Sequence, residues 1–450
     1  MRNVKVVVIL LVAAAGLGWW WQCSSDSADT AARVDGVVFP AASVEVFVRV
    51  AQQQDSDVSR KQVLDGLIEN HLFAQVEHDD EHQDGGSGLV TYSEETQQQN
   101  ELFRIVRQVF SHEVEQALQA EGVTSPADLF VTELVADEET LLPLLEVKPG
   151  PYPVMDADQE QAARLLVLAR YRLLDGSEKD MTLADLYQQQ NIQLKVQMHQ
   201  MNTDFMREAA MQYVSTQFVL DWFAHHSGLT ENEVLAVKRM ISERQVKEEM
   251  LHGLGLMHDI HDDNPQLREL ANAVTAAEVS AYYDAHKEQF QRVEKVRARH
   301  IRLDSQEEAD ALFRELRNGL AFDQAVQRFQ GAAGSNSEKV FEQAGDLGWI
   351  DRDDRNTHWL RSLAFVQPLK KASAPFRSPG LSDQVYWEII FLDEKLMGYQ
   401  PVESEGVRYE ASKSIAQEKM QQQFASLRDS LWQQAQVSYN EKWLNASDGQ

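Results

Sequence analysis

The segment from Val293 to Lys395 constrains the fold most, because strand-like and helix-like patterns follow one another along it in a defined order. An apolar alternation over Ala298–Leu303 comes first, and an amphipathic helical pattern follows over Glu307–Arg328. A glycine-containing turn with a strand-like run, Gly345–Trp349, comes next, and the hydrophobic run Tyr386–Ile390 closes the segment. This order predicts an α+β domain in which helices flank an antiparallel sheet.

The strand-like runs resemble those of the parvulin-type (rotamase, PpiC) peptidyl-prolyl isomerase domain. That family's first strand reads Ala-Arg-His-Ile, as this chain does from Ala298, and its middle turn reads Gly-Gly-Asp-Leu-Gly-Trp, which this chain matches from Gly345. The family's last strand usually reads Gly-Tyr-His-Ile-Ile, where this chain has Tyr-Trp-Glu-Ile-Ile from Tyr386. Glu388 therefore stands in place of the family's second histidine.

Proline isomerisation makes specific demands on a site. An X–Pro bond crosses a barrier of about 18–20 kcal/mol between its cis and trans forms. Lowering that barrier takes a dry pocket for the proline ring and polar groups that favour the twisted amide, but no nucleophile. We therefore expect no cofactor and no metal at this site.

The resemblance also implies which residues form the site. In parvulins, two histidines on adjacent central strands lie beneath the pocket, and leucine, methionine and phenylalanine side chains line its apolar wall. His300 matches the first histidine, and Glu388 would be close enough to pair with it. For substrate binding, the apolar candidates are Leu360 and Phe365, with Trp359 as the alternative to Leu360, and Trp387.

Other positions depart from the family pattern. The family's methionine falls near the polar Asn356, and Gln330–Gly334 offers neither the cysteine nor the aspartate of parvulins. A carboxylate at Glu388 would also face a substrate carbonyl oxygen, and its desolvation is costly unless His300 or Arg302 pairs with it. We therefore expect isomerase turnover below that of parvulins with both histidines. The alternative is a holdase chaperone with a catalytically degenerate parvulin domain.

The sequence before this segment predicts a large helical region. Ser59 and Gln62 have the spacing of a capping box, and helical patterns follow over Glu94–Glu121, Gln159–Leu174 and Met181–Leu270.

The run Val63–Glu69, taken with the later domain, resembles the start of the SurA, PpiD and PrsA foldases. That resemblance implies a chaperone-like region with one parvulin-like domain and a C-terminal helix that packs on the N-terminal region. The expected domains are an N-terminal anchor or signal, the helical region, the parvulin-like domain and the C-terminal helix, at residues 1–23, 33–290, 291–398 and 399–450.

Charge is distributed unevenly along the chain. The formal net charge is −29, which argues against nucleic acid as a partner, because phosphate binding needs a basic face. Residues 291–398 contain 16 Lys and Arg against 17 Asp and Glu, so the net charge there is −1 and the remainder carries −28. The parvulin-like segment is therefore nearly neutral within a strongly acidic chain.

The N-terminus predicts attachment to a membrane. Arg2 and Lys5 precede the uncharged, mostly apolar run Val6–Trp21, which ends in three tryptophans suited to the outer interface. A cleaved signal peptide and a lipoprotein signal are the alternatives, but no clean cleavage site follows and Gln22 precedes Cys23. We expect a single-pass inner-membrane anchor over residues 6–21, with the bulk of the chain in the periplasm.

Other candidate sites have simpler explanations. The clusters His78–His82 and His252–Asp263 could bind metal, but in a chain with 71 acidic residues we favour solvated acidic loops. The single cysteine, Cys23, excludes an intramolecular disulfide. Methionines between Met198 and Met257 could line an adaptable groove, although ordinary core positions are favoured.

These observations combine into a membrane-anchored periplasmic folding factor. Its partners would be unfolded or proline-containing exported polypeptides, on which the parvulin-like domain would act as a peptidyl-prolyl isomerase. A dedicated partner role for one membrane or secreted complex stays open, as do the identity of the clients and the oligomeric state.

Overall fold

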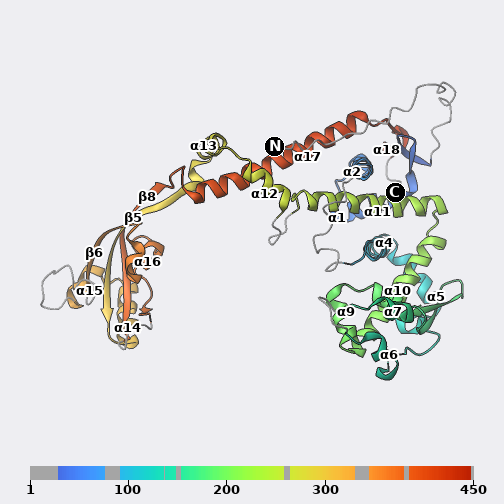
Figure 1. Cartoon of the computed structure of the whole chain (residues 1–450), viewed down its shortest axis with the longest axis horizontal. Helices are drawn as coiled ribbons and strands as arrows, with labels where there is room; N and C mark the ends of the chain where they lie inside the picture. Colours follow the sequence, from blue (N-terminus) through green and yellow to red (C-terminus); the bar gives the residue numbers. More distant parts are fainter. Residues whose placement is uncertain are drawn as a thin grey trace. The chain divides into compact units, whose positions relative to one another are not determined.

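The computed structural model describes residues 29–76, 92–135, 137–147, 154–257, 264–329, 344–379 and 385–446. The expected anchor, the cluster His78–His82 and residues 258–263 of the second acidic cluster lie outside them. The chain divides into two compact units, Met1–Gly253 with Gln423–Gln450 and Leu254–Gln422 (Figure 1). Within the described part of the chain, no helix has the length and apolar character needed to cross a membrane.

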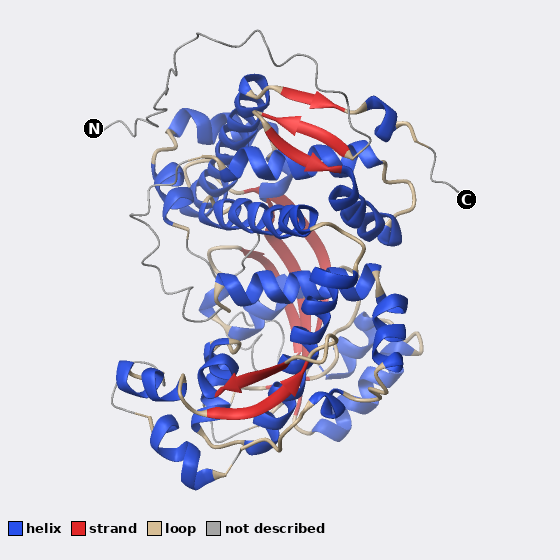
Figure 2. Cartoon of the chain, turned by 90° about the vertical axis from the view of Figure 1, so that its right-hand side faces the viewer, coloured by secondary structure: helices blue, strands red, loops and turns tan. Residues whose placement is uncertain are grey.

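The first unit is mainly helical and contains two small antiparallel sheets, ordered β2-β1-β9 and β3-β4 (Figure 2). Its strands are β1 (Thr30–Val34), β2 (Val37–Pro40), β3 (Val167–Arg172), β4 (Glu178–Thr182) and β9 (Val437–Tyr439). Its longer helices are α1 (Ala41–Gln54), α2 (Arg60–Ala74), α4 (Glu94–Val109), α5 (Ser111–Ala120), α10 (Thr203–His226) and α11 (Glu231–Gly253). Its shorter helices are η2 (Pro126–Leu129), α6 (Glu138–Leu145), α7 (Ala157–Ala163), α8 (Leu183–Gln188), α9 (Ile192–His199) and α18 (Glu441–Leu444).

Local sequence accounts for the ends and the buried faces of these helices. The Ser59 side chain accepts from the Gln62 amide and the Gln62 side chain accepts from the Ser59 amide, which confirms the predicted capping box of α2. Met198, Met206 and Met240 are buried in the core that joins these helices, so these three methionines serve packing.

The β3–β4 hairpin corrects the helix predicted over Gln159–Leu174. Helix α7 ends at Ala163, and β3 begins four residues later at Val167. Apolar periodicity alone cannot separate a short strand from a buried helical segment. The turn between β3 and β4 favours a hairpin over a continuous helix, because Gly176 adopts a φ of 78°, which glycine tolerates without strain.

The C-terminal residues complete the first sheet. Strand β9 pairs antiparallel with β1, and the Tyr439 hydroxyl donates to Asp65 Oδ1 at 2.8 Å. Phe424, on the later part of α17 (Glu405–Gln434), stacks on Phe73 of α2 with ring centroids 4.8 Å apart. Residues from both ends of the sequence therefore share one core.

The second unit is built on a four-stranded antiparallel sheet ordered β6-β5-β8-β7. Its strands are β5 (Gln291–Leu303), β6 (Ala344–Asp351), β7 (Phe376–Arg377) and β8 (Trp387–Tyr399). Its helices are α12 (Pro265–Asn272), α13 (Ala276–Ala285), η3 (Lys287–Phe290), α14 (Gln306–Arg317), α15 (Phe322–Phe329), η4 (Arg355–Thr357), α16 (Trp359–Val366) and the first part of α17. The predicted α+β architecture, a helical region with an antiparallel-sheet domain, is confirmed.

The two faces of this sheet have separate cores. Helices α14 and α15 cover one face, where Ile301 and Ile389 are buried, and α16 covers the other, where Ala298 and Ile390 are buried (Figure 1). This separation follows from the strand period of two, since successive side chains point to opposite faces.

A third apolar cluster joins the sheet domain to its helical flanks. Phe290, just before β5, packs with residues of α13 and of the first part of α17, including Val279 and Val407. These helical flanks and the sheet belong to one compact unit, Leu254–Gln422, which contains the predicted domain at residues 291–398.

Candidate active site

His300 and Glu388 lie side by side on the sheet face that α16 covers. His300 Nδ1 is 2.7 Å from Glu388 Oε2, and both side chains are 0% exposed. The register explains this, because β5 and β8 are antiparallel neighbours in which Arg302 lies opposite Glu388. His300 and Arg302 are two residues apart on β5, so both face Glu388 on the same side of the sheet.

Arg302 completes a cluster that we call the sheet cluster: His300, Arg302 and Glu388. Arg302 Nε donates to Glu388 Oε1 at 2.7 Å, so each carboxylate oxygen has a partner, and the arginine side chain is 16% exposed. The guanidinium lies 3.7 Å from the centre of the Tyr386 ring, in a cation–π contact. Two close partners supply the pairing that a fully buried carboxylate requires.

Helix α16 supplies the apolar wall next to the sheet cluster. Leu360 and Phe365 are buried against Ile390 and its neighbours, and Trp359 is partly buried against the same group of side chains. The Trp359 and Tyr386 rings lie 6.2 Å apart, which connects this wall to the arginine. Three of the four apolar residues assigned to substrate binding therefore lie on the face that carries His300.

Trp387 does not join them. It packs with the cluster under α14 and α15, on the opposite face of the sheet. Trp387 and Glu388 are consecutive in β8, so their side chains must point to opposite faces. The geometry separates Trp387 from the other candidate site residues.

His358 is a site residue that the sequence analysis missed. It is the N-cap of α16, and its Nδ1 accepts a hydrogen bond from the Leu360 amide at 3.2 Å. Burial lowers the pKa of His358, and the positive charge of Arg302 lowers this pKa further, whereas Glu388 opposes the shift. The position of His358 just before a helical pattern could have indicated a helix N-cap, but Ser, Thr, Asp and Asn are the residues expected at an N-cap.

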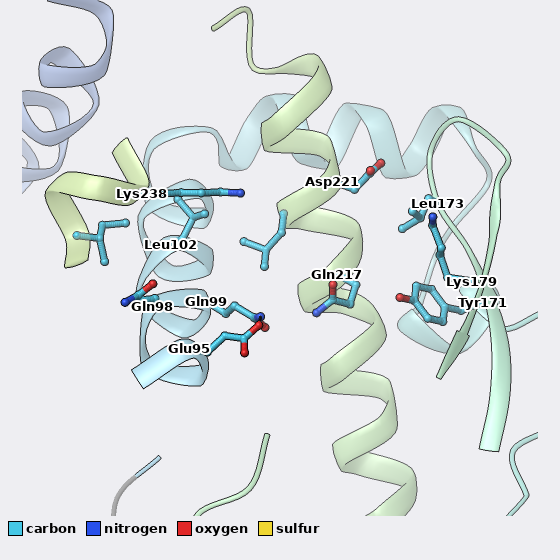
Figure 3. Close-up of a pocket in the computed structure, with 12 residues that line it drawn as sticks. Glu95, Gln98, Gln99, Leu102, Tyr171, Leu173, Lys179, Gln217, Asp221 and Lys238 are labelled. Carbon is cyan, nitrogen blue, oxygen red and sulfur yellow. Dashed lines mark hydrogen bonds between the residues drawn. The ribbon is translucent and has the colours of Figure 1, made fainter. Parts of the chain in front are cut away.

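A cavity of about 500 Å³ lies in the first unit, between α4, α10, α11 and the β3–β4 hairpin (Figure 3). Its apolar lining consists of Leu102, Tyr171, Leu173, Leu220 and Ile241. Its polar lining consists of Glu95, Gln98, Gln99, Lys179, Gln217, Asp221 and Lys238. In the described ranges, no three histidine, cysteine or acidic side chains gather to hold a metal ion, in this cavity or near the sheet cluster.

The parvulin resemblance is confirmed by comparison with protein families. Residues 274–379 match the model of the PPIC-type PPIASE domain. The matched segment contains His300, Arg302, His358 and all of α16, and it ends before β8 and Glu388. No curated protein sequence matches the chain.

Solved structures give weaker likenesses. A SurA-like chaperone of Campylobacter jejuni is 18% identical, with 53% of this chain and 86% of that chain covered and a TM-score of 0.20. The foldase PrsA of Streptococcus pneumoniae is 16% identical, with 51% and 71% covered and a TM-score of 0.19. The peptidylprolyl isomerase PrsA of Bacillus anthracis is 19% identical, with 48% and 93% covered and a TM-score of 0.19.

Proposed function

We propose, from the PPIC-type PPIASE domain at residues 274–379, that this chain is a folding factor that accelerates cis–trans exchange of X–Pro bonds in other polypeptides. One observation carries the proposal: the sheet face to which this domain contributes β5 and α16 combines the α16 wall with the buried sheet cluster. A dry apolar surface beside fixed polar groups is what rotation about an amide bond needs.

The catalytic steps would involve no covalent bond to the protein. Rotation about the C–N bond removes the amide resonance, so groups that favour the twisted amide over the planar one lower the barrier. Trp359, which is only partly buried, offers apolar surface to the proline ring, and the Arg302 guanidinium, held by Glu388, places positive charge beside the substrate carbonyl oxygen.

We also propose that turnover is below that of parvulins with both histidines. His300 and Glu388 are completely buried and bonded to one another, so they act on a bound peptide only through neighbouring side chains. Glu388 serves in this account to hold Arg302 in place, because its second oxygen accepts from that guanidinium.

The same proposal includes a place of action at the inner membrane. Residues 6–21 would anchor the chain, with Arg2 and Lys5 on the cytoplasmic side and exported polypeptides as clients on the periplasmic side. Membrane fractionation with N-terminal sequencing tests this. A mature chain that starts near Ala31 and is free in the periplasm would contradict the anchor.

A holdase activity is the second candidate, and the cavity in the first unit favours it. The amides of Gln98, Gln99 and Gln217 offer both donors and acceptors to a peptide backbone, and apolar side chains line the same cavity. The lining carries two acidic and two basic side chains, so its formal charges balance. Filling the cavity by Gln217→Trp should weaken suppression of client aggregation and leave proline exchange intact, whereas Gln212→Trp, on an exposed position of the same helix, should affect neither.

Exchange NMR on a short proline peptide tests the isomerase proposal. The full chain should raise the cis–trans exchange rate of the peptide in proportion to protein concentration. Absence of both exchange enhancement and peptide binding would contradict an isomerase. Binding of the peptide without exchange, together with suppression of aggregation, would favour the holdase.

A further inference from the structure

The charged side chains around the first-unit cavity are separated along its length. Figure 3 shows Glu95 towards one end, and the ammonium groups of Lys179 and Lys238 together with Asp221 towards the other end. The lysine end therefore has a formal charge of 2 − 1 = +1, and the end with Glu95 has a formal charge of −1. The cavity is neutral as a whole but has one positive end.

The two carboxylates of the cavity already have neighbours within the first unit. Asp221 Oδ1 lies 3.2 Å from His225 Nδ1, which forms an ion pair when that ring is protonated. Glu95 Oε1 accepts a hydrogen bond from Gln99 Nε2 at 3.3 Å. Each carboxylate therefore has a partner that holds it in the wall of the cavity.

The two lysines lack such partners. In the ranges that the structure describes, the ammonium groups of Lys179 and Lys238 form neither a salt bridge nor a hydrogen bond. Hydrogen bonds from Ser177 lower the pKa of Asp175 in the hairpin turn, and the charge of Lys179 lowers this pKa further without a direct contact. Both lysines are exposed, so they can reach a ligand at the mouth of the cavity.

The unit around this cavity is strongly acidic. Residues 1–253 contain 19 Lys and Arg against 40 Asp and Glu, so their net charge is 19 − 40 = −21. Two other lysines of this unit, Lys61 and Lys247, each lie 2.6 Å from a carboxylate oxygen. The lysines of the cavity therefore differ from these two, because their charge is available to an anion from outside the unit.

The remaining lining suits a polypeptide. Four apolar side chains of the lining are buried, namely Leu102, Tyr171, Leu173 and Ile241. Gln217 of α10 is half-buried, and its amide forms no hydrogen bond with another described residue, so it offers a donor and an acceptor to a peptide group. A volume of about 500 Å³ lies in the range of roughly 300–1,000 Å³ that is typical of ligand sites.

We infer that this cavity binds a polypeptide segment that carries a carboxylate next to an apolar side chain. The carboxylate pairs with Lys238 or Lys179, the apolar side chain packs on the buried lining, and the Gln217 amide bonds to the peptide backbone. This inference rests on the proposed holdase activity and names the class of client segment that it recognises. An acidic side chain and the terminal carboxylate of a client present the same chemical group.

Three forms of one short fluorescent peptide of alanine, leucine and phenylalanine test the inference. The first form has a free terminal carboxylate, the second has an amidated terminus, and the third has an amidated terminus and one internal glutamate. Fluorescence anisotropy with the full chain measures the Kd of each form. We expect at least one carboxylate form to bind about fivefold more tightly than the form without a carboxylate. The two carboxylate forms identify whether a terminus or a side chain is bound.

Matched lysine substitutions locate the effect. Lys238→Met keeps an unbranched apolar side chain but removes the charge, so the advantage of the carboxylate form should disappear while binding of the amidated form stays unchanged. Lys442→Met removes the same charge at an exposed position of α18, outside the cavity, and should leave all three affinities unchanged. In the wild type the advantage should shrink as salt concentration rises, because exposed charges are screened.

The outcomes separate this inference from the holdase activity. A carboxylate preference that Lys238→Met or Lys179→Met removes and Lys442→Met retains supports the inference. Equal affinities for all three forms, or a preference that both cavity variants keep, overturn the carboxylate assignment, and suppression of client aggregation by the same protein leaves the holdase standing. A full chain that binds no form of the peptide and does not suppress aggregation overturns the holdase activity and the assignment with it.

Discussion

Two regions of the molecule use the same three side-chain types in different ways. The sheet cluster joins His300, Arg302 and Glu388 across two strands. In the first unit, His71 of α2 and Arg239 and Glu243 of α11 form a second set, here called the helix cluster. In both clusters the histidine Nδ1 lies 2.7 Å from a glutamate oxygen.

The arginines distinguish the two clusters. In the sheet cluster, Arg302 binds the second carboxylate oxygen at 2.7 Å, so the glutamate is paired on both sides. In the helix cluster, the closest approach of Arg239 to Glu243 is 3.4 Å, and Glu243 Oε2 has no hydrogen-bond partner among the described residues. Arg239 instead donates to the Val38 carbonyl at 3.0 Å and lies over the Phe39 ring.

The two clusters therefore contain the same side-chain types but have different roles. The helix cluster connects α2 and α11 to β2 inside a packed core, where its arginine donates a hydrogen bond to a backbone carbonyl. The sheet cluster uses its glutamate to fix an arginine beside the apolar wall of α16. We interpret the first as structural and the second as part of the proposed site.

The largest expected effect comes from removing the carboxylate of the sheet cluster. Glu388→Ala leaves His300 and Arg302 without their shared partner in a buried setting, so we expect a loss of about 3–5 kcal/mol in the unfolding free energy of the second unit. Hydrogen exchange of β5 and β8 amides, followed by mass spectrometry in urea, measures it. Unchanged protection of both strands would show that the cluster contributes nothing to the sheet.

The matching substitution in the helix cluster should lower the unfolding free energy by a smaller amount. Glu243→Ala removes one bond to His71, but Arg239 keeps its bond to Val38 and its side chain is 33% exposed, so its charge stays partly hydrated. We expect a loss of about 1–3 kcal/mol, measured by exchange of α2 and α11 amides. A loss as large as that of Glu388→Ala would erase the distinction between the clusters.

A smaller effect should follow from removing the ring over Arg302. Tyr386→Leu keeps an apolar side chain but deletes the cation–π contact at 3.7 Å, so we expect a loss of about 0.5–2 kcal/mol in sheet stability. The same substitution should weaken proline-peptide binding, because Arg302 gains freedom. Urea titration and peptide titration followed by NMR test the two parts. Equal stability and equal peptide affinity would show that the ring does not hold the arginine.

The smallest expected effect concerns an exposed pair in the second unit, which contrasts with both buried clusters. Hydrogen bonds from Lys419 and Thr275 lower the pKa of Glu278 from 4.5 to about 2. A carboxylate whose pKa is lower in the folded state stabilises above its unfolded pKa, and that stabilisation disappears as pH falls from 4.5 toward 2. Glu278→Gln should therefore flatten the acid dependence of α13 protection in this window, measured by hydrogen exchange. An identical dependence in the variant would show that Glu278 is not linked to folding.

Motifs and local rules predicted much of the fold. The capping box at Ser59 and Gln62 needed only neighbouring residues, and the family motifs placed His300 and Glu388 on adjacent strands. The pairing of Glu388 with His300 or Arg302 followed from the cost of an unpaired buried carboxylate, and the structure contains both pairs.

Other features depend on information that no local pattern contains. His71 and Glu243 are 172 residues apart, so only tertiary packing brings them together. His358 lacks a family motif and is an uncommon helix cap. The sequence alone could have excluded Trp387 from the predicted substrate-binding residues. Neighbouring residues of a strand face opposite sides of the sheet, and Glu388 was already assigned to the face that carries the site.

Paired amide substitutions give the most direct test of the claim that the sheet cluster serves the site and the helix cluster serves the core. In Glu388→Gln, an uncharged amide replaces the carboxylate, so Arg302 loses its charge-assisted bond, while Glu243→Gln makes the same change in the first unit. The measurement is the exchange NMR rate of a proline peptide with each full-length variant. We expect the rate to fall about tenfold in Glu388→Gln and to match wild type in Glu243→Gln. Equal rates in all three proteins, or a loss confined to Glu243→Gln, would contradict the account.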